Sequence, residues 1–203
     1  MRALAALGRT DEARTQLDVL VARAEGPRVH LADYLHDLAE ELTWHGQPAL
    51  ARAAGEREVA LREAAARDSG RAFGAQRRLA GAYAVSGRWD DAARVLGPLA
   101  ARDTSTEIQW LAATAAAHRG DTASAQRLAA QLAARRPVPY QGHFLLRVRA
   151  NLAAVLGRRD EMLALLREMA ASGIGLAWEI HGDPDFAPYQ RDPEFRALMA
   201  PVG

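Results

Sequence analysis

Apolar residues recur at helical spacing along the chain, and glycines interrupt them at regular distances. A helical stretch ends at a Gly, one to three polar residues follow, and a second helical stretch begins, as in AVSGRWDDAARVL and AVLGRRDEMLALL. The pattern occurs five times, 33 to 41 residues apart, with turn glycines at Gly8, Gly46, Gly87, Gly120 and Gly157. It predicts a series of helix–turn–helix units, because a repeat of this length fits one helix pair.

The residues after each glycine suit a tight turn between two packed helices. Glycine readily adopts the left-handed conformation that ends many helices. Acids expected to cap the following helix or to lie in its first turn are Asp11, Asp90, Asp121 and Asp160. The position five residues after the glycine, where a small side chain lets the second helix approach the first, holds Ala13, Ala51, Ala92, Ala125 and, in the last unit, Met162.

The third unit carries the clearest resemblance to a known family. Its matching positions are Leu79, Tyr83, Gly87, Ala92, Leu96 and Leu99. They resemble the consensus of the tetratricopeptide repeat, a helix–turn–helix of 34 residues, and the likeness covers about residues 1–172. In the second unit Gly55 departs from the pattern, because a large residue is usual there.

The resemblance implies an all-α fold. It would be a right-handed α-α superhelix, a tetratricopeptide-like solenoid of about five helix pairs with a C-terminal capping helix. The array would cover residues 1–175, in units of about 1–26, 27–69, 70–103, 104–138 and 139–175, with a tail at 176–203. Separators between units are Pro27, the pair Thr104–Ser105, and Pro137. An irregular helical bundle is the alternative.

The C-terminal tail carries a short motif twice, at Asp183–Phe186 and at Asp192–Phe195. Asp as the N-cap followed by Pro at the first helical position is a good helix start, so we expect a capping helix over Arg191–Met199 with Phe195 and Leu198 turned inward. The tail resembles the end of tetratricopeptide regions in large bacterial signalling proteins that carry kinase, cyclase or winged-helix domains. None of those domains is present in this sequence, so their activities are not carried over.

The first unit is incomplete if Gly8 is its turn, since Met1 then falls about halfway along a helix. A half-helix leaves the apolar face of its partner exposed, whereas terminal repeats usually present a polar cap. We therefore expect either a longer chain upstream or a partner that covers this face. A natural short start that frays is the alternative.

Composition narrows the class of protein. Hydrophobic residues make up 49% of the 203 residues but aromatic ones only 6%, and 46 residues are Ala, which favours closely packed helices over a β-sandwich. The net charge of +1 without a basic cluster argues against nucleic acid as a partner. No apolar run is long enough for a transmembrane helix, so we expect no membrane insertion. We expect a bacterial cytoplasmic location, or a periplasmic one for a membrane-anchored longer protein.

The sequence shows no pattern of catalytic chemistry. Cys is absent, and no nucleophile elbow, phosphate-binding loop, dinucleotide fingerprint or H-E-x-x-H is present. His36 and Glu40 share a helix face near Asp33 and Asp37, but a metal site needs a third converging ligand. We therefore predict no catalytic, cofactor-binding or metal-binding residues, and no enzyme.

The resemblance instead implies a concave groove lined by the first helix of each unit. Transferring the groove positions of the family, residue by residue, gives Asp33, His36, Glu40, Trp44, Arg77, Trp110, Thr114, His118, Arg147 and Asn151. Arg147 and Asn151 resemble half of the carboxylate clamp of some family members. Arg77, Trp110 and Arg147 share one consensus position and would form one wall, suited to an extended acidic peptide. Packing of Trp44 and Trp110 against the next unit is the alternative.

These features predict a protein–protein interaction scaffold. Its groove would bind a peptide or a partner domain, as the docking or sensor segment of a bacterial signalling or regulatory system, and an effector domain upstream in a longer chain is a candidate partner. The alternative is an all-helical enzyme or small-ligand-binding protein that uses the inner face around His36, Trp110 and His118. An open groove favours the scaffold, and a closed pocket with converging titratable groups favours the alternative.

Overall fold

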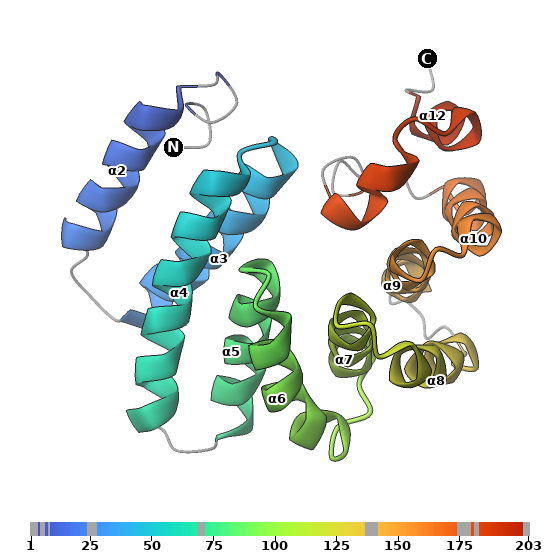
Figure 1. Cartoon of the computed structure of the whole chain (residues 1–203), viewed down its shortest axis with the longest axis horizontal. Helices are drawn as coiled ribbons and strands as arrows, with labels where there is room; N and C mark the ends of the chain where they lie inside the picture. Colours follow the sequence, from blue (N-terminus) through green and yellow to red (C-terminus); the bar gives the residue numbers. More distant parts are fainter. Residues whose placement is uncertain are drawn as a thin grey trace. The chain divides into compact units, whose positions relative to one another are not determined.

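Every element that the structure describes is helical, which confirms the predicted all-α class for that part of the chain. The structure is a computed structural model that describes residues 4, 7, 9–23, 28–68, 72–136, 142–173, 180 and 183–200. Helices that follow one another in the chain pack as neighbours, as in α3 with α4 and α9 with α10 (Figure 1). The prediction that these pairs form a tetratricopeptide-like superhelix goes beyond this finding and stays a prediction.

The chain divides into two compact units, Met1–Leu99 and Ala100–Gly203. The first contains α2 (Thr10–Arg23), α3 (Arg28–Trp44), α4 (Pro48–Asp68), α5 (Phe73–Val85) and α6 (Trp89–Ala100), which ends at the boundary. The second contains α7 (Thr106–His118), α8 (Thr122–Ala133), α9 (Gly142–Val155), α10 (Arg159–Ala171), the 3-10 helix η1 (Pro184–Tyr189) and α12 (Pro193–Met199). The predicted units from 27 to 175 therefore each contain one helix pair.

Four of the predicted turns share one backbone geometry. Gly46, Gly87, Gly120 and Gly157 have φ of +67° to +77°. At the first of them, Gln47 N–H donates to the Leu42 carbonyl over 2.8 Å, and the same bond recurs at the other three. This pattern closes a helix with a left-handed residue, a conformation that is strained for any residue with a Cβ. The proposed turn at Gly8 and the separators Pro27 and Pro137 lie outside the described residues, whereas Thr104–Ser105 does separate α6 from α7.

The residue five positions after the glycine is buried in every unit. These residues are Ala13, Ala51, Ala92, Ala125 and Met162, each no more than 4% exposed. Asp121 caps α8 through a bond from the Ser124 amide, and Asp90 lies in the first turn of α6, as the sequence predicts. In the first four units a small side chain therefore fills this buried position, and in the last unit Met162 fills it.

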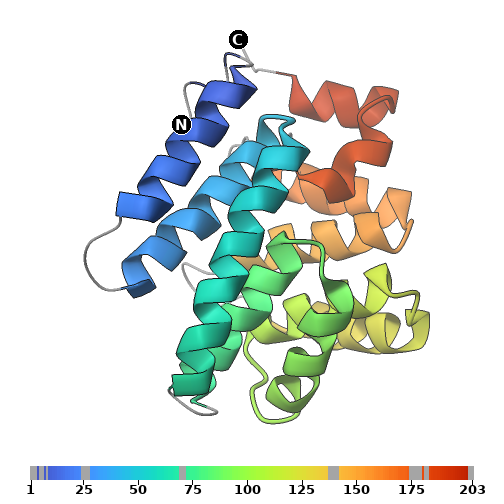
Figure 2. The same ribbon diagram turned by 60° about the vertical axis from the view of Figure 1, so that its left-hand side comes forward.

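In the first unit, α4 packs on α3 and on α5 (Figure 2). The core between α3 and α4 is mainly leucine, including Leu35, Leu38 and Leu50. Gly55 of α4 is buried against the end of α5, and a Cβ built on it would lie 2.6 Å from Ser86 Oγ. The glycine that departs from the repeat pattern is thus explained by a close approach of two helices.

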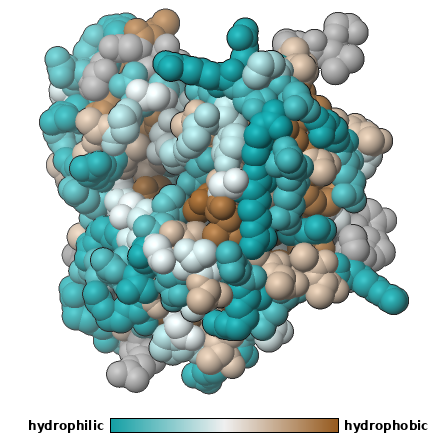
Figure 3. All heavy atoms as spheres, turned by 45° about the vertical axis from the view of Figure 1, so that its right-hand side comes forward, coloured by the Kyte–Doolittle hydropathy of each residue, from teal (hydrophilic) through white to brown (hydrophobic). Residues whose placement is uncertain are grey.

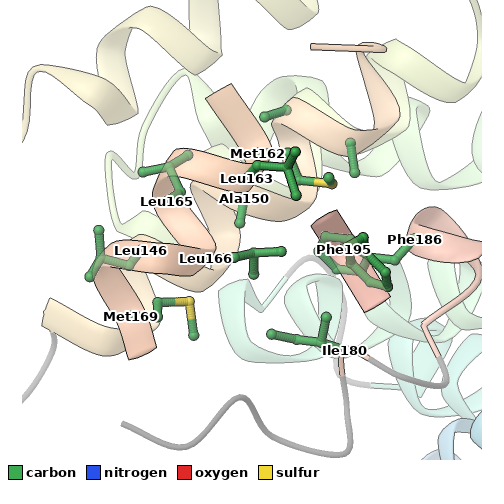
Figure 4. Close-up of a cluster of buried hydrophobic side chains, with 12 residues drawn as sticks. Leu146, Ala150, Met162, Leu163, Leu165, Leu166, Met169, Ile180, Phe186 and Phe195 are labelled. Atoms are coloured by element: carbon green, nitrogen blue, oxygen red, sulfur yellow. The ribbon is translucent and has the colours of Figure 1, made fainter. Parts of the chain in front are cut away.

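In the second unit the tail completes the core of the last helix pair. Phe186 of η1 and Phe195 of α12 stack with ring centroids 6.0 Å apart, and Leu166, Met162 and Ile180 belong to the same buried cluster (Figure 4). The predicted inward placement of Phe195 and Leu198 is confirmed. The capping helix begins at Pro193 rather than at the predicted Arg191, because Asp192 occupies the N-cap and accepts hydrogen bonds from the next amides. The face drawn in Figure 3 is mostly hydrophilic, with apolar patches between the polar side chains.

Candidate functional site

The candidate site of the second unit lies where α7 and α9 meet the start of η1. Trp110, Thr114 and His118 follow one another at intervals of four residues, so they share one face of α7. Arg147 and Asn151 are spaced in the same way on α9. All five are among the residues that the repeat register assigns to the groove.

Asn151 connects this face to the tail. The indole Nε1 of Trp110 donates to Asn151 Oδ1 over 2.9 Å. An indole N–H can only donate, so the amide oxygen must face it and the amide nitrogen must point the other way. Asn151 Nδ2 then donates to Asp183 Oδ2 over 3.1 Å and to Asp185 Oδ2 over 3.0 Å. The amide is 3% exposed, so α9 presents a buried donor that binds two carboxylates.

The remaining carboxylate oxygens of the tail also have partners. Asp183 Oδ1 accepts from the Asp185 amide over 2.9 Å and so caps η1. Asp185 Oδ1 lies 3.0 Å from His118 Nε2. The sequence pattern already indicated that Asp183 caps a helix, and the bonds to Asn151 and His118 come in addition.

Crowding of the two carboxylates changes the acidity of one of them. Burial, followed by the charge of Asp185, raises the pKa of Asp183 to about 7, against the opposing effects of the Asp185 amide, Arg147 and Asn151. A carboxyl with this pKa is about half protonated at neutral pH. The negative charge that the tail brings to α9 therefore depends on pH.

Two aromatic rings and the guanidinium of Arg147 lie close to the carboxylates. The Arg147 guanidinium lies 5.6 Å from the centroid of the Trp110 ring and 5.4 Å from that of Phe144. The two rings meet edge to face, 6.3 Å apart. The register expected Trp110 and Arg147 on one wall, and these two residues are in contact. Arg77, the third residue of that predicted wall, belongs to the first unit.

Thr114 differs from its neighbours on α7. Its residue is 4% exposed, and its Oγ1 is buried without a hydrogen-bond partner within the described part of the chain. It therefore lies beneath the surface of this face, between Trp110 and His118 in the helix.

In the first unit, the groove residues of α3 bind to α4. His36 Nδ1 lies 3.1 Å from Glu58 Oε2, and Glu58 is fully buried. Arg62 donates from Nε to Glu58 Oε1 over 3.3 Å and from Nη2 to Asp33 Oδ1 over 2.6 Å. Glu40 Oε1 lies 3.7 Å from His36 Nε2.

The neighbouring acids, chiefly Glu58, change the pKa of His36. Burial lowers the pKa of His36, but the hydrogen bond to Glu58 and the charges of Glu58 and Glu40 outweigh burial, so the pKa is raised. The ring also lies against α5, since a Cβ built on Gly81 would be 3.8 Å from His36 Cε1. The remaining predicted groove residues of this unit, Trp44 and Arg77, are half-buried.

Known proteins offer no guide to this site. No protein-family model, curated protein or solved structure matches the chain. The likeness to the tetratricopeptide repeat thus rests on the sequence pattern.

Within the described ranges, no three side chains of His, Cys, Asp or Glu gather as metal ligands would. No described helix is both long enough and apolar enough to cross a membrane.

Sequence reasoning missed four residues of these clusters, Glu58, Arg62, Asp183 and Asp185, as partners of the groove residues. For Glu58 and Arg62 a signal existed, because both fall on the face of α4 that also carries Leu50, Ala54 and Val59. A charged pair four residues apart on an apolar face points to a buried partner. For the tail acids the local signal was fully explained by capping.

Proposed function

We propose that the chain is a protein-interaction module whose inner helices bind an extended segment of a partner. It would serve as the docking or sensor part of a bacterial signalling or regulatory system. One observation carries the proposal: the face of α7 and α9 already binds an acidic chain segment, residues 183–185, through the side chains of Asn151 and His118. The same donors can bind an acidic segment of a partner in place of this one.

The neighbouring residues suit peptide recognition. Trp110 and Phe144 supply aromatic area, and Arg147 supplies a planar cation beside them. Aromatic and Arg side chains carry much of the binding energy in protein interfaces. In the proposal the acids of a partner approach Asn151, His118 and Arg147, while its apolar side chains cover the rings.

The proposal includes no catalytic step. Each of the three residues that suggested an enzyme makes a hydrogen bond within its own unit: His36 with Glu58, Trp110 with Asn151, and His118 with Asp185. A module that holds polar side chains in place for binding accounts for these bonds directly.

Charge reversal in the groove tests the proposal. Arg77→Glu or Arg147→Glu should reduce capture of a partner from a lysate of the source organism at least tenfold, a loss of about 1.4 kcal/mol or more. The matched controls are Arg52→Glu on α4 and Arg127→Glu on α8, which reverse exposed charges on the second helix of a pair. Thermal melting of all four variants checks the fold. Undiminished capture by both groove variants would refute the proposal.

A further inference from the structure

The two copies of the tail motif are used differently. In the second copy, Asp192 and Glu194 bind the Arg159 guanidinium, whose Nη2 donates to Asp192 Oδ1 over 3.0 Å and to Glu194 Oε1 over 2.8 Å. These acids face a full positive charge. In the first copy, Asp183 and Asp185 face the neutral amide of Asn151.

The tail is held to α9 and α10 by its apolar part. Phe186 is 1% exposed and Phe195 is 2% exposed, and both belong to the buried cluster of α9 and α10. Tyr189 Oη donates to the Ala154 carbonyl over 3.0 Å. None of these contacts uses the carboxylates of Asp183 and Asp185, and the one link of these acids to η1 is the N-cap that Asp183 supplies.

The negative charges of Asp183 and Asp185 are less well compensated than those of Asp192 and Glu194, which bind the Arg159 guanidinium. Two carboxylates share one amide group, and burial together with the charge of Asp185 raises the pKa of Asp183. Arg147, whose charge acts on Asp183, lies over the rings of Trp110 and Phe144. Displacing Asp183 and Asp185 breaks their polar contacts with Asn151 and His118 and their attraction to Arg147. It exposes none of the buried rings of Phe186 and Phe195, so it costs less than displacing the apolar part of the tail.

We propose that Asp183–Pro184–Asp185 is a tethered ligand, which occupies the place on α7 and α9 where an acidic segment of a partner binds. The inference rests on the proposed function and adds its regulation: the partner must displace the tail's own acids. A short tether keeps the local concentration of these acids on the order of millimolar. The apparent affinity for the partner is the intrinsic affinity multiplied by the fraction of molecules whose site is open. It is therefore lowered for as long as the tail occupies the site.

The test compares the two copies of the motif in the full chain. Asp183→Ser with Asp185→Ser keeps a capping hydroxyl for η1 but is too short to reach Asn151. Asp192→Ser with Glu194→Ser makes the matched change at the Arg159 site. The probe is a blocked peptide, GDPDAAPYQ, in which Ala replaces the anchoring Phe, and its binding is followed by NMR through the indole N–H of Trp110.

We expect the Asp183/Asp185 variant to bind the peptide at least tenfold more tightly than the unmodified chain, and the Asp192/Glu194 variant to bind as the unmodified chain does. A peptide with Asn in place of both Asp residues should bind none of them. Equal peptide binding by the Asp183/Asp185 variant and the unmodified chain would overturn the proposal.

A third substitution locates the binding. Asn151→Asp keeps the acceptor for Trp110 but replaces the donor by a carboxylate, so adding it to the Asp183/Asp185 variant should abolish peptide binding. Persisting binding would overturn the assignment to this face. Partner capture separates the two proposals: if it depends on Arg147 while peptide binding fails to improve, the tethered ligand is refuted and the groove function stands.

Discussion

Asn151 shows how a single neutral side chain organises the polar groups of the second unit. Its oxygen is fixed by Trp110, and its two N–H groups are then committed to Asp183 and Asp185. An amide in this position has no remaining donor, so any third acid must compete rather than add. The residue thus limits the site to one pair of carboxylates at a time.

The raised pKa of Asp183 predicts a pH dependence of stability. Because the pKa of about 7 in the folded chain exceeds the ordinary value near 4 for an unfolded Asp, the folded state holds a proton that the unfolded state has lost. Stability should therefore fall as pH rises from about 4 to about 7, by up to about 1.4 kcal/mol per pH unit, and level off above that range.

Urea unfolding between pH 4 and 8 measures this dependence against Asp183→Asn, which stays neutral throughout. The difference between the two chains isolates Asp183 from Asp185, His118 and Arg147, which surround it. A difference that is independent of pH would show that Asp183 has an ordinary pKa in the folded chain.

At the scale of the element, the need for glycine in the turns can be tested by comparing one turn glycine with one glycine inside a helix. Gly87 has φ of +70°, so Gly87→Ala should destabilise the chain by about 1–2 kcal/mol. Gly97 lies in α6 with open space around it, so Gly97→Ala should stabilise by about 0.5–1 kcal/mol. Chemical denaturation of both variants gives the comparison, and effects of the same sign would contradict the turn assignment.

The elements were predictable where the signal is local. Gly87 and the buried Ala92 mark a turn and a close helix contact within six residues of sequence, and backbone sterics alone decide both. The caps Asp121 and Asp192 were found for the same reason. Glycine at 55 looked like a departure because its reason, the side chain of Ser86, lies 31 residues away.

The candidate site was predictable only in part. The register named Trp110, Arg147 and Asn151, since a repeat fixes which face of a helix turns inward. It could not supply Asp183, because the path of the tail back onto α9 depends on where Phe186 and Phe195 find a core. Contacts between distant segments follow from packing, which a periodicity does not encode.

At the scale of the whole molecule, the tail closes the core of the second unit. Phe186→Ala should destabilise by about 3–5 kcal/mol, because it leaves a cavity beside Phe195 and the α9–α10 pair. Hydrogen exchange should show the loss of protection in α9 and α10. The control is Phe73→Ala, whose ring is 43% exposed and whose loss should cost little. An equal effect of both substitutions would show that the tail is not part of the core.

The buried Glu58 has a consequence for how α3 and α4 recognise each other. On α4 the core shared with α3 includes Ala51 and Ala54, whose small side chains are so alike that they alone oppose sliding only weakly. A slip by one helical turn, about 5.4 Å, would carry Glu58 away from His36 and Arg62 away from Asp33. The buried Glu58 carboxylate would then keep only the bond from Arg62 of its own helix, and both bonds between the two helices would be lost. Glu58 thus favours one position of α4 along α3 among several that the small side chains would otherwise allow.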